Sequence, residues 1–204
     1  MRRIIGGLFM TVDGVMQAPG APDEDRSGGF AYGGWAAGYS DEQTGVFIAE
    51  QIQGAEYDLL LGRRTYDIFA DYWPRHLASP IGERFDRITK YVVTSDPDTL
   101  GWRGSQPLVG NLAETVAALR SGDGPDLLIQ GSSQLYPPLF SAGLVDRIFL
   151  TVMPIILGAG KRVLTGDAAA ATGMRLVDHR VSQTGVVMSV YERDGPVRTG
   201  DFTT

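Results

Sequence analysis

The chain has 204 residues, of which 43% are hydrophobic and 21% are charged, and its formal net charge at pH 7 is −6. These values are typical of one large globular domain. An acidic chain whose basic residues cluster only in pairs is not expected to bind nucleic acid, because it repels phosphate backbones. The chain has no Cys and only two His residues, which excludes disulfides and thiolate chemistry and predicts no metal site.

The N-terminal apolar segment, residues 3–11, predicts a buried strand that ends at Asp13-Gly14. The segment is too short to span a bilayer, because a membrane helix needs about 20 apolar residues. It also lacks the longer apolar region and the cleavage site of a signal peptide. We therefore expect no membrane segment and a cytoplasmic location.

A long irregular segment, Gln17–Tyr39, is rich in Gly, Pro and Ala and also carries aromatic residues. Loops longer than about 12–15 residues in a compact domain are usually functional or disordered. Aromatic residues are uncommon in disordered spacers. The segment therefore predicts a lid or a pocket wall, with an ordinary ordered surface loop as the alternative. Its candidate ligand contacts are Tyr32 and Trp35.

Strand and helix patterns alternate along the rest of the chain. Ser40 and Gln43 have the spacing of a reciprocally capped helix start, and Gly54 predicts the helix end. Further strands are expected at residues 57–61, 91–94, 126–130 and 147–153. Further helices are expected to follow Gly62, to cover residues 80–88 and 112–121, and to begin late or kinked near Pro137 and Pro138.

Two more strand patterns, residues 175–182 and 186–192, predict a hairpin around Gln183-Thr184-Gly185. Strands that alternate with helices indicate a mainly parallel sheet with helices on both faces. The predicted fold is therefore a three-layer α/β domain over residues 1–193. Its central sheet is mixed and mostly parallel, with a C-terminal antiparallel hairpin. Residues 194–204 are expected to form a flexible tail.

Two strand-to-helix turns have residue types that suit a phosphate. Gly62-Arg63-Arg64-Thr65 follows the second expected strand, and Gly131-Ser132-Ser133-Gln134 follows the fourth. Helix N-termini offer free N–H groups to an anion, and Arg adds charged hydrogen bonds. Each turn alone also fits an ordinary helix start. Because ligands bind at the carboxyl ends of parallel strands, two such turns on one sheet favour a nucleotide cleft.

Other nucleotide and nucleophile motifs are missing from the sequence. There is no GxGxxG fingerprint, no complete P-loop and no GxSxG elbow. Asp41 and Glu42 stand at the start of the helix that follows the aromatic loop. These acids either compensate the helix dipole or hold and protonate a polar heterocycle.

Six segments carry a family resemblance: residues 4–14, 58–66 (DLLLGRRTY), 90–95, 128–133, 144–146 (LVD) and 154–161 (PIILGAGK). In this order they resemble the RibD C-terminal domain family of the dihydrofolate reductase superfamily. The resemblance extends from Arg2 to Glu192 and implies a dihydrofolate-reductase-like fold.

The resemblance also implies a reductase that uses NADPH as hydride donor. In this family the rate depends on how the nicotinamide is positioned against the acceptor. The residues matched to the cofactor site are Val15, Met16, Gln17, Gly62, Arg63, Arg64, Thr65, Thr94, Ser95, Gly131, Ser132, Ser133, Gln134 and Leu135.

The implied acceptor is a small heterocyclic or phosphoribosyl compound, as in 5-amino-6-(5-phosphoribosylamino)uracil reductase or dihydrofolate reductase. Dihydrofolate reductases hold the pterin with a helix acid. Alignment on Gly62 without a gap puts Val46 there, and Asp41 reaches that place only with a longer connection. The candidate catalytic residues are Asp41 and Thr151. The candidate substrate-binding residues are Tyr32, Trp35, Asp41, Phe47 and Lys161.

Two other classes of function remain open at this point. One is a non-catalytic module that binds a nucleotide or another small molecule on the same fold. The other is a structural or partner-binding protein, for which the cleft is closed and empty. The family commonly forms homodimers, so the resemblance implies a homodimer here.

Overall fold

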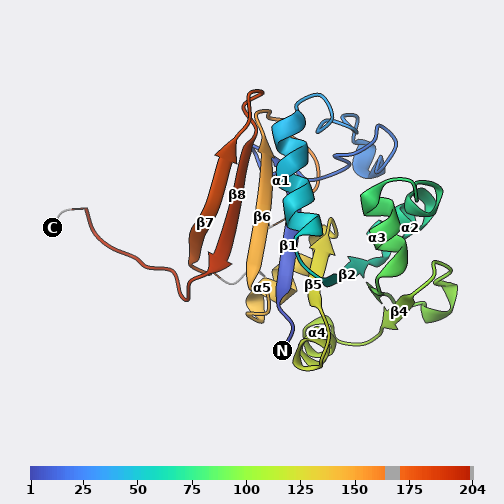
Figure 1. Cartoon of the computed structure of the whole chain (residues 1–204). Coiled ribbons are helices and arrows are strands. Elements are labelled where there is room, and N and C mark those ends of the chain that lie inside the picture. Colours follow the sequence, from blue (N-terminus) through green and yellow to red (C-terminus); the bar gives the residue numbers. More distant parts are fainter. Residues whose placement is uncertain (164–170, 203–204) are drawn as a thin grey trace.

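The computed structural model describes residues 1–163 and 171–202, and its strands form one mixed sheet (Figure 1). The strands are β1 (Ile4–Thr11), β2 (Tyr57–Gly62), β3 (Lys90–Val93), β4 (Ser105–Leu108), β5 (Asp126–Gln130), β6 (Arg147–Met153), β7 (Met174–Val181) and β8 (Val187–Arg193). Their order in the sheet is β4-β3-β2-β5-β1-β6-β8-β7. The pairs from β4 to β6 are parallel, and β8 pairs antiparallel with both β6 and β7.

Helices cover both faces of this sheet. They are α1 (Glu42–Gln53), α2 (Arg63–Tyr72), α3 (Pro80–Arg87), α4 (Leu112–Ser121) and α5 (Tyr136–Ser141). Successive residues of β2 point to opposite faces, so Leu59 packs in one core cluster with Phe47 of α1, and Leu60 packs in the other with Val116 of α4. No helix in the described part of the chain is long and apolar enough to cross a membrane. The predicted three-layer fold is confirmed.

Two local expectations were wrong. The N-cap of α1 is Asp41 rather than Ser40, because the Asp41 carboxylate accepts hydrogen bonds from the backbone N–H and hydroxyl of Thr44. No strand was expected from the sequence where β4 lies. This edge strand carries Pro107 among weak strand formers, a pattern tolerated only at a sheet edge.

The chain after β8 leads away from the sheet (Figure 1). Arg198 forms an ion pair with Asp194 four residues earlier. Residues 203–204 of the expected tail lie outside the described residues. The division at residue 193 therefore stays a prediction.

A charged group lies inside the sheet at Lys90, whose side chain is fully buried in β3. Its Nζ donates to the carbonyls of Asp86 and Ile88, at 3.0 Å each. The Nζ also lies 4.2 Å from the ring centroid of Trp102. Burial lowers the pKa of Lys90 to about 8, although the negative charge of Asp86 opposes this shift. The folded chain thus releases this proton more readily than the unfolded chain.

The free energy of unfolding should depend on pH because of Lys90. Between pH 8 and the unfolded pKa of about 10.4, the unfolded chain binds more protons, so this group adds stability as the pH increases. Relative to Lys90→Met, we expect wild-type stability to rise by up to about 1.4 kcal/mol per pH unit in that window. Urea unfolding at pH 7, 8, 9 and 10 measures the difference, and parallel pH curves for the two proteins would contradict the assignment.

Candidate active site

A cavity of about 1250 Å³ lies at the carboxyl ends of the parallel strands. The last residues of β2, β3 and β5 (Gly62, Val93 and Gln130) line it, and Gly7 of β1 forms part of its floor. A Cβ at Gly7 would lie 2.4 Å from Phe149 Cζ and 2.7 Å from Gln130 Oε1, so only glycine fits there. Open parallel sheets bind their ligands at this edge.

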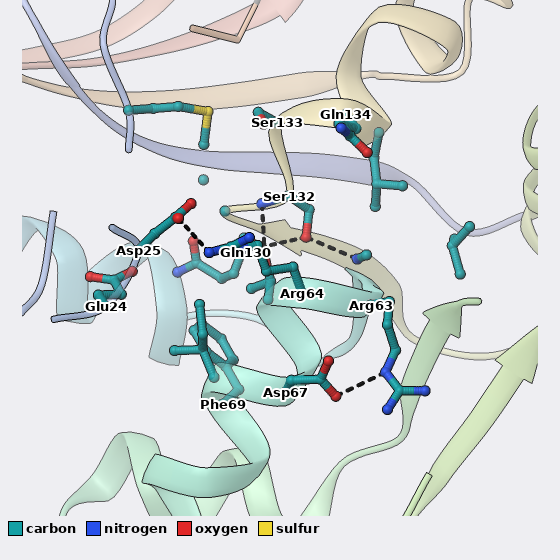
Figure 2. Close-up of a pocket in the computed structure, with 18 of the residues that line it drawn as sticks. Glu24, Asp25, Arg63, Arg64, Asp67, Phe69, Gln130, Ser132, Ser133 and Gln134 are labelled. Carbon is teal, nitrogen blue, oxygen red and sulfur yellow. Dashed lines mark hydrogen bonds and ion pairs between the residues drawn. The ribbon is translucent and has the colours of Figure 1, made fainter. Parts of the chain in front are cut away.

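The two phosphate-type turns meet in this cavity and are bonded to each other (Figure 2). The Ser132 hydroxyl accepts from the Gly62 N–H at 2.9 Å, and the Ser132 N–H donates to Thr65 Oγ1 at 3.1 Å. The Ser132 hydroxyl also donates to the Gln130 carbonyl at 3.2 Å. Because β2 and β5 are neighbours in the sheet, these bonds fix the distance between the turns.

The backbone of both turns suits an anion. Gly131 and Ser132 have consecutive positive φ angles of 58° and 55°, and no side chain caps the short 3-10 helix that starts at Ser133. Ser132 is strained there, because side chains other than glycine disfavour this region. No side chain caps the N-terminus of α2 at Gly62. That helix start keeps free N–H donors and the positive end of its dipole.

The loop over residues 17–30 forms another wall of the cavity, and Gln17 fastens it. The Gln17 Nε2 donates to the carbonyls of Asp25 and Ser27, at 3.0 and 2.9 Å. Its Oε1 accepts from the Lys161 N–H at 3.0 Å, and its backbone carbonyl accepts from Trp35 Nε1 at 2.7 Å. One buried amide thus joins the loop to the segment after β6.

Two cations of the cavity are held by a single acid, Asp25. Its carboxylate lies 2.5 Å from Arg64 Nη2 and 2.5 Å from Lys161 Nζ, and only 10% of its side chain is exposed. Burial alone would raise the pKa of Asp25, but hydrogen bonds from Lys161 and Ser27 hold it below its usual value. Burial raises the pKa of the neighbouring Glu24, and the Asp25 charge adds to that effect. Figure 2 shows both acids across the cleft from Arg63.

Most of the residues proposed from the sequence line this cavity. They are Met16, Gln17, Gly62, Arg63, Arg64, Thr65, Thr94, Ser95, Gly131, Ser132, Ser133, Gln134, Leu135 and Lys161. The structure brings these residues together from five separate segments of the chain.

Asp41 and Phe47 were proposed as substrate contacts but lie away from the cavity. Asp41 caps α1, and its other oxygen accepts from Thr184 of the β7–β8 turn. The Thr44 N–H lowers the pKa of Asp41 to about 2, so this carboxylate is ionised at neutral pH and is a poor proton donor. Phe47 is fully buried in the core, and Val46, at the family's acid position, is exposed.

Four other proposed residues also lie outside the cavity lining. Trp35 is buried beside the loop, whereas Tyr32 is 56% exposed at its surface. Val15 is buried and pairs with Arg162 in an isolated bridge. Thr151 is fully buried in β6 between Phe9 and Met188, and its hydroxyl has no hydrogen-bond partner among the described residues. Trp35, Val15 and Thr151 thus lie in the interior, and Tyr32 lies at the surface.

An apolar wall and an acidic pair were not anticipated from the sequence. The wall consists of Ile48, Ile52, Phe69, Trp73, Ile81 and Phe85, contributed by α1, by α2 with the turn after it, and by α3. The helical spacing of Phe69 and Trp73 is the same as that of core residues, so spacing alone does not reveal a cavity. Glu24 and Asp25 belong to the irregular loop, where no periodicity indicates a direction.

A family model described as the RibD C-terminal domain matches residues 2–188. This chain belongs to the RibD C-terminal domain family. Membership in this family of reductase domains supports a reductase-type function. The chain is also 26% identical over 200 residues to "Uncharacterized protein YyaP" of Bacillus subtilis strain 168, an alignment that covers 95% of this chain and 96% of that protein.

Solved structures with this fold support the same architecture. A putative riboflavin biosynthesis protein from Shewanella sp. PV-4 has a TM-score of 0.67 at 19% identity, covering 94% of this chain and 99% of that one. A pyrimidine reductase-like protein from Corynebacterium diphtheriae has a TM-score of 0.59 at 13% identity, covering 97% and 93%. Dihydrofolate reductase from Enterococcus faecalis, complexed with NADP(H) and RAB-propyl, has a TM-score of 0.58 at 17% identity, covering 94% and 96%.

The hydrogen bonds between the two turns predict different losses of stability for two Ser132 variants. Ser132→Ala keeps the strained backbone and leaves the Gly62 N–H without its partner, so we expect a loss of about 1–3 kcal/mol of stability. Ser132→Gly loses the same hydroxyl but relieves the strain, so its loss should be smaller. Urea unfolding measures both, with Ser133→Ala in the same turn as control. Equal losses for the two Ser132 variants would show that strain is not stored there.

Proposed function

We propose that this protein is an NADPH-dependent reductase that transfers a hydride to a small heterocyclic acceptor. The observation that carries the proposal is the pair of strand-to-helix turns, Gly62–Thr65 and Gly131–Leu135, bonded to each other at one cavity. Such turns suit the phosphates of a dinucleotide. Family membership supports the reductase chemistry, and a relative of known structure is described with NADP(H).

The chain offers three kinds of phosphate contact in this proposal. The uncapped helix starts at Arg63 and Ser133 supply backbone N–H groups, whereas the N–H groups of Gly62 and Ser132 are used in the bonds between the turns. Arg63 supplies charge; its side chain is 35% exposed and is held by Asp67, at 2.8 Å, and by the Thr99 hydroxyl. Exposed ion pairs are weak, so Arg63 exchanges Asp67 for a phosphate at low cost. Arg64 contributes less, because Asp25 already holds its guanidinium.

Bound NADPH would supply the hydride. The protein itself would hold the cofactor and the acceptor in position and exclude water. Gly7 and Gln130 form the floor of the cavity beside the turns, and the loop fastened by Gln17 closes one side. A reaction between two held partners gains most of its rate from this placement. No nucleophilic side chain is required.

The first test is titration of NADPH and NADH into the purified protein, followed by nicotinamide fluorescence. We expect NADPH to bind more tightly than NADH. Arg63→Ala should weaken NADPH binding by about tenfold, which corresponds to one charge-assisted contact. Arg75→Ala is the matched control. Arg75, like Arg63, pairs with an Asp four positions away in the chain, but it lies outside the cavity lining.

The outcomes of this titration separate the alternatives. Absence of binding by either nucleotide at high micromolar concentration would refute the cofactor proposal. Tight NADPH binding without oxidation of NADPH by any pterin, flavin or uracil derivative would instead favour the non-catalytic binding module on the same fold.

We also propose a homodimer. The edge strand β7 supports this, because its apolar side chains Leu176 and Val181 are 46% and 61% exposed. We expect light scattering at micromolar concentration to report twice the chain mass, and Val181→Lys to shift the protein towards monomer. Val197→Lys, at an exposed valine outside the sheet, is the control. A monomeric wild-type protein would contradict the assembly.

A further inference from the structure

One end of the cavity is an aromatic wall that is already assembled. The Phe69 and Phe85 rings stack with centroids 5.8 Å apart and planes at 19°. Trp73 meets Phe85 edge-on, with centroids 5.1 Å apart and planes at 80°. Phe69 and Trp73 are half-buried, and Ile48 and Ile52 of α1 complete the wall. Such a surface binds flat apolar rings through stacking and burial of apolar area.

The charges of the cavity are the second observation. Its lining contains three cations (Arg63, Arg64 and Lys161) and four carboxylates (Glu24, Asp25, Asp67 and Asp96). Each of the three cations is already in an ion pair with Asp67 or Asp25. The described lining therefore presents no unpaired cation to an acceptor that carries a phosphate.

The two sets of ion pairs are not equivalent. Arg63 and Asp67 are 35% and 51% exposed, so their ion pair is weaker than one made by a nearly buried acid. Asp25 is nearly buried and also accepts from the N–H and hydroxyl of Ser27, at 3.0 and 2.6 Å. An acceptor phosphate that took Arg64 and Lys161 would leave the Asp25 charge buried without its cations, which is strongly unfavourable.

We propose that the acceptor is an uncharged molecule with a flat aromatic ring seated against Phe69 and Trp73, and that Asp25 excludes phosphorylated acceptors by neutralising Arg64 and Lys161. This inference rests on the proposed reductase function and narrows its substrate class. Asp25 acts here as a specificity-determining residue, and the phosphoribosyl class of acceptor is disfavoured.

The test uses matched probes that differ only by a phosphate: riboflavin with FMN, and uridine with UMP. Calorimetric titrations are run at 0.15 M salt, with and without saturating NADPH. With NADPH bound at the two turns, we expect each neutral probe to bind about tenfold more tightly than its phosphorylated partner. Because the probes are also titrated without cofactor, failure of NADPH binding and failure of acceptor selection give different results.

Asp25→Asn keeps the size of the side chain and frees the two cations. We expect it to tighten FMN binding by about tenfold and to leave riboflavin binding unchanged. The double variant Asp25→Asn with Lys161→Gln should lose most of this gain, which separates a charge effect from a disturbed loop. Asp71→Asn is the control, since Asp71 also pairs with an Arg but lies outside the lining.

Phe69→Ala tests the aromatic wall. It should weaken riboflavin binding by about tenfold and leave the NADPH titration unchanged. Thermal unfolding of each variant confirms that it is folded. Three results would overturn the proposal: phosphorylated probes that bind wild-type protein as tightly as the neutral ones, riboflavin binding that is insensitive to Phe69→Ala, or no binding by any of the four probes.

Discussion

The bonds between Ser132 and the Gly62–Thr65 turn are the constraint on which the cleft depends. Parallel pairing of β2 and β5 brings the two strand ends to one edge, but sheet pairing alone does not orient the turns that follow. The hydroxyl and N–H of Ser132 do so, at the cost of a left-handed backbone. Strain kept at a strand end beside a cavity is typical of a site whose geometry is needed for binding.

The three cations that line the cleft are each paired with a carboxylate. An anionic cofactor of the kind proposed would need local attraction in this acidic protein, and the uncapped helix starts together with Arg63 would supply it. The side chains of Arg64 and Lys161 both form ion pairs with Asp25, which also anchors the loop over the cavity. The same ion pairs therefore fix the loop and set the charge seen by a ligand.

The sequence predicted the fold, and it predicted that the two strand-to-helix turns meet at one cleft, because both depend on local patterns. Alternating strands and helices imply a parallel sheet, and a small-residue turn after a strand, such as Gly131-Ser132, has a recognisable geometry. Which other residues line the cleft depends on long-range packing. Nothing local distinguishes Phe69 from a core residue, or reveals that Asp25 meets Lys161, 136 positions away. Asp41 was proposed as a ligand contact but caps α1 in the structure, because a helix cap and a ligand-binding acid use the same residue type.

Gln17 gives the loop an unusual mechanical character. Its side chain and carbonyl connect the loop to Trp35, to the turn at Ser27 and to the backbone of Lys161. These segments are therefore coupled as one stiff body rather than as a freely hinged flap. The tip of the loop is held as well, because the Glu24 carboxylate accepts from the N–H groups of Gly20 and Ala21, so an insertion there would break bonds of the loop itself.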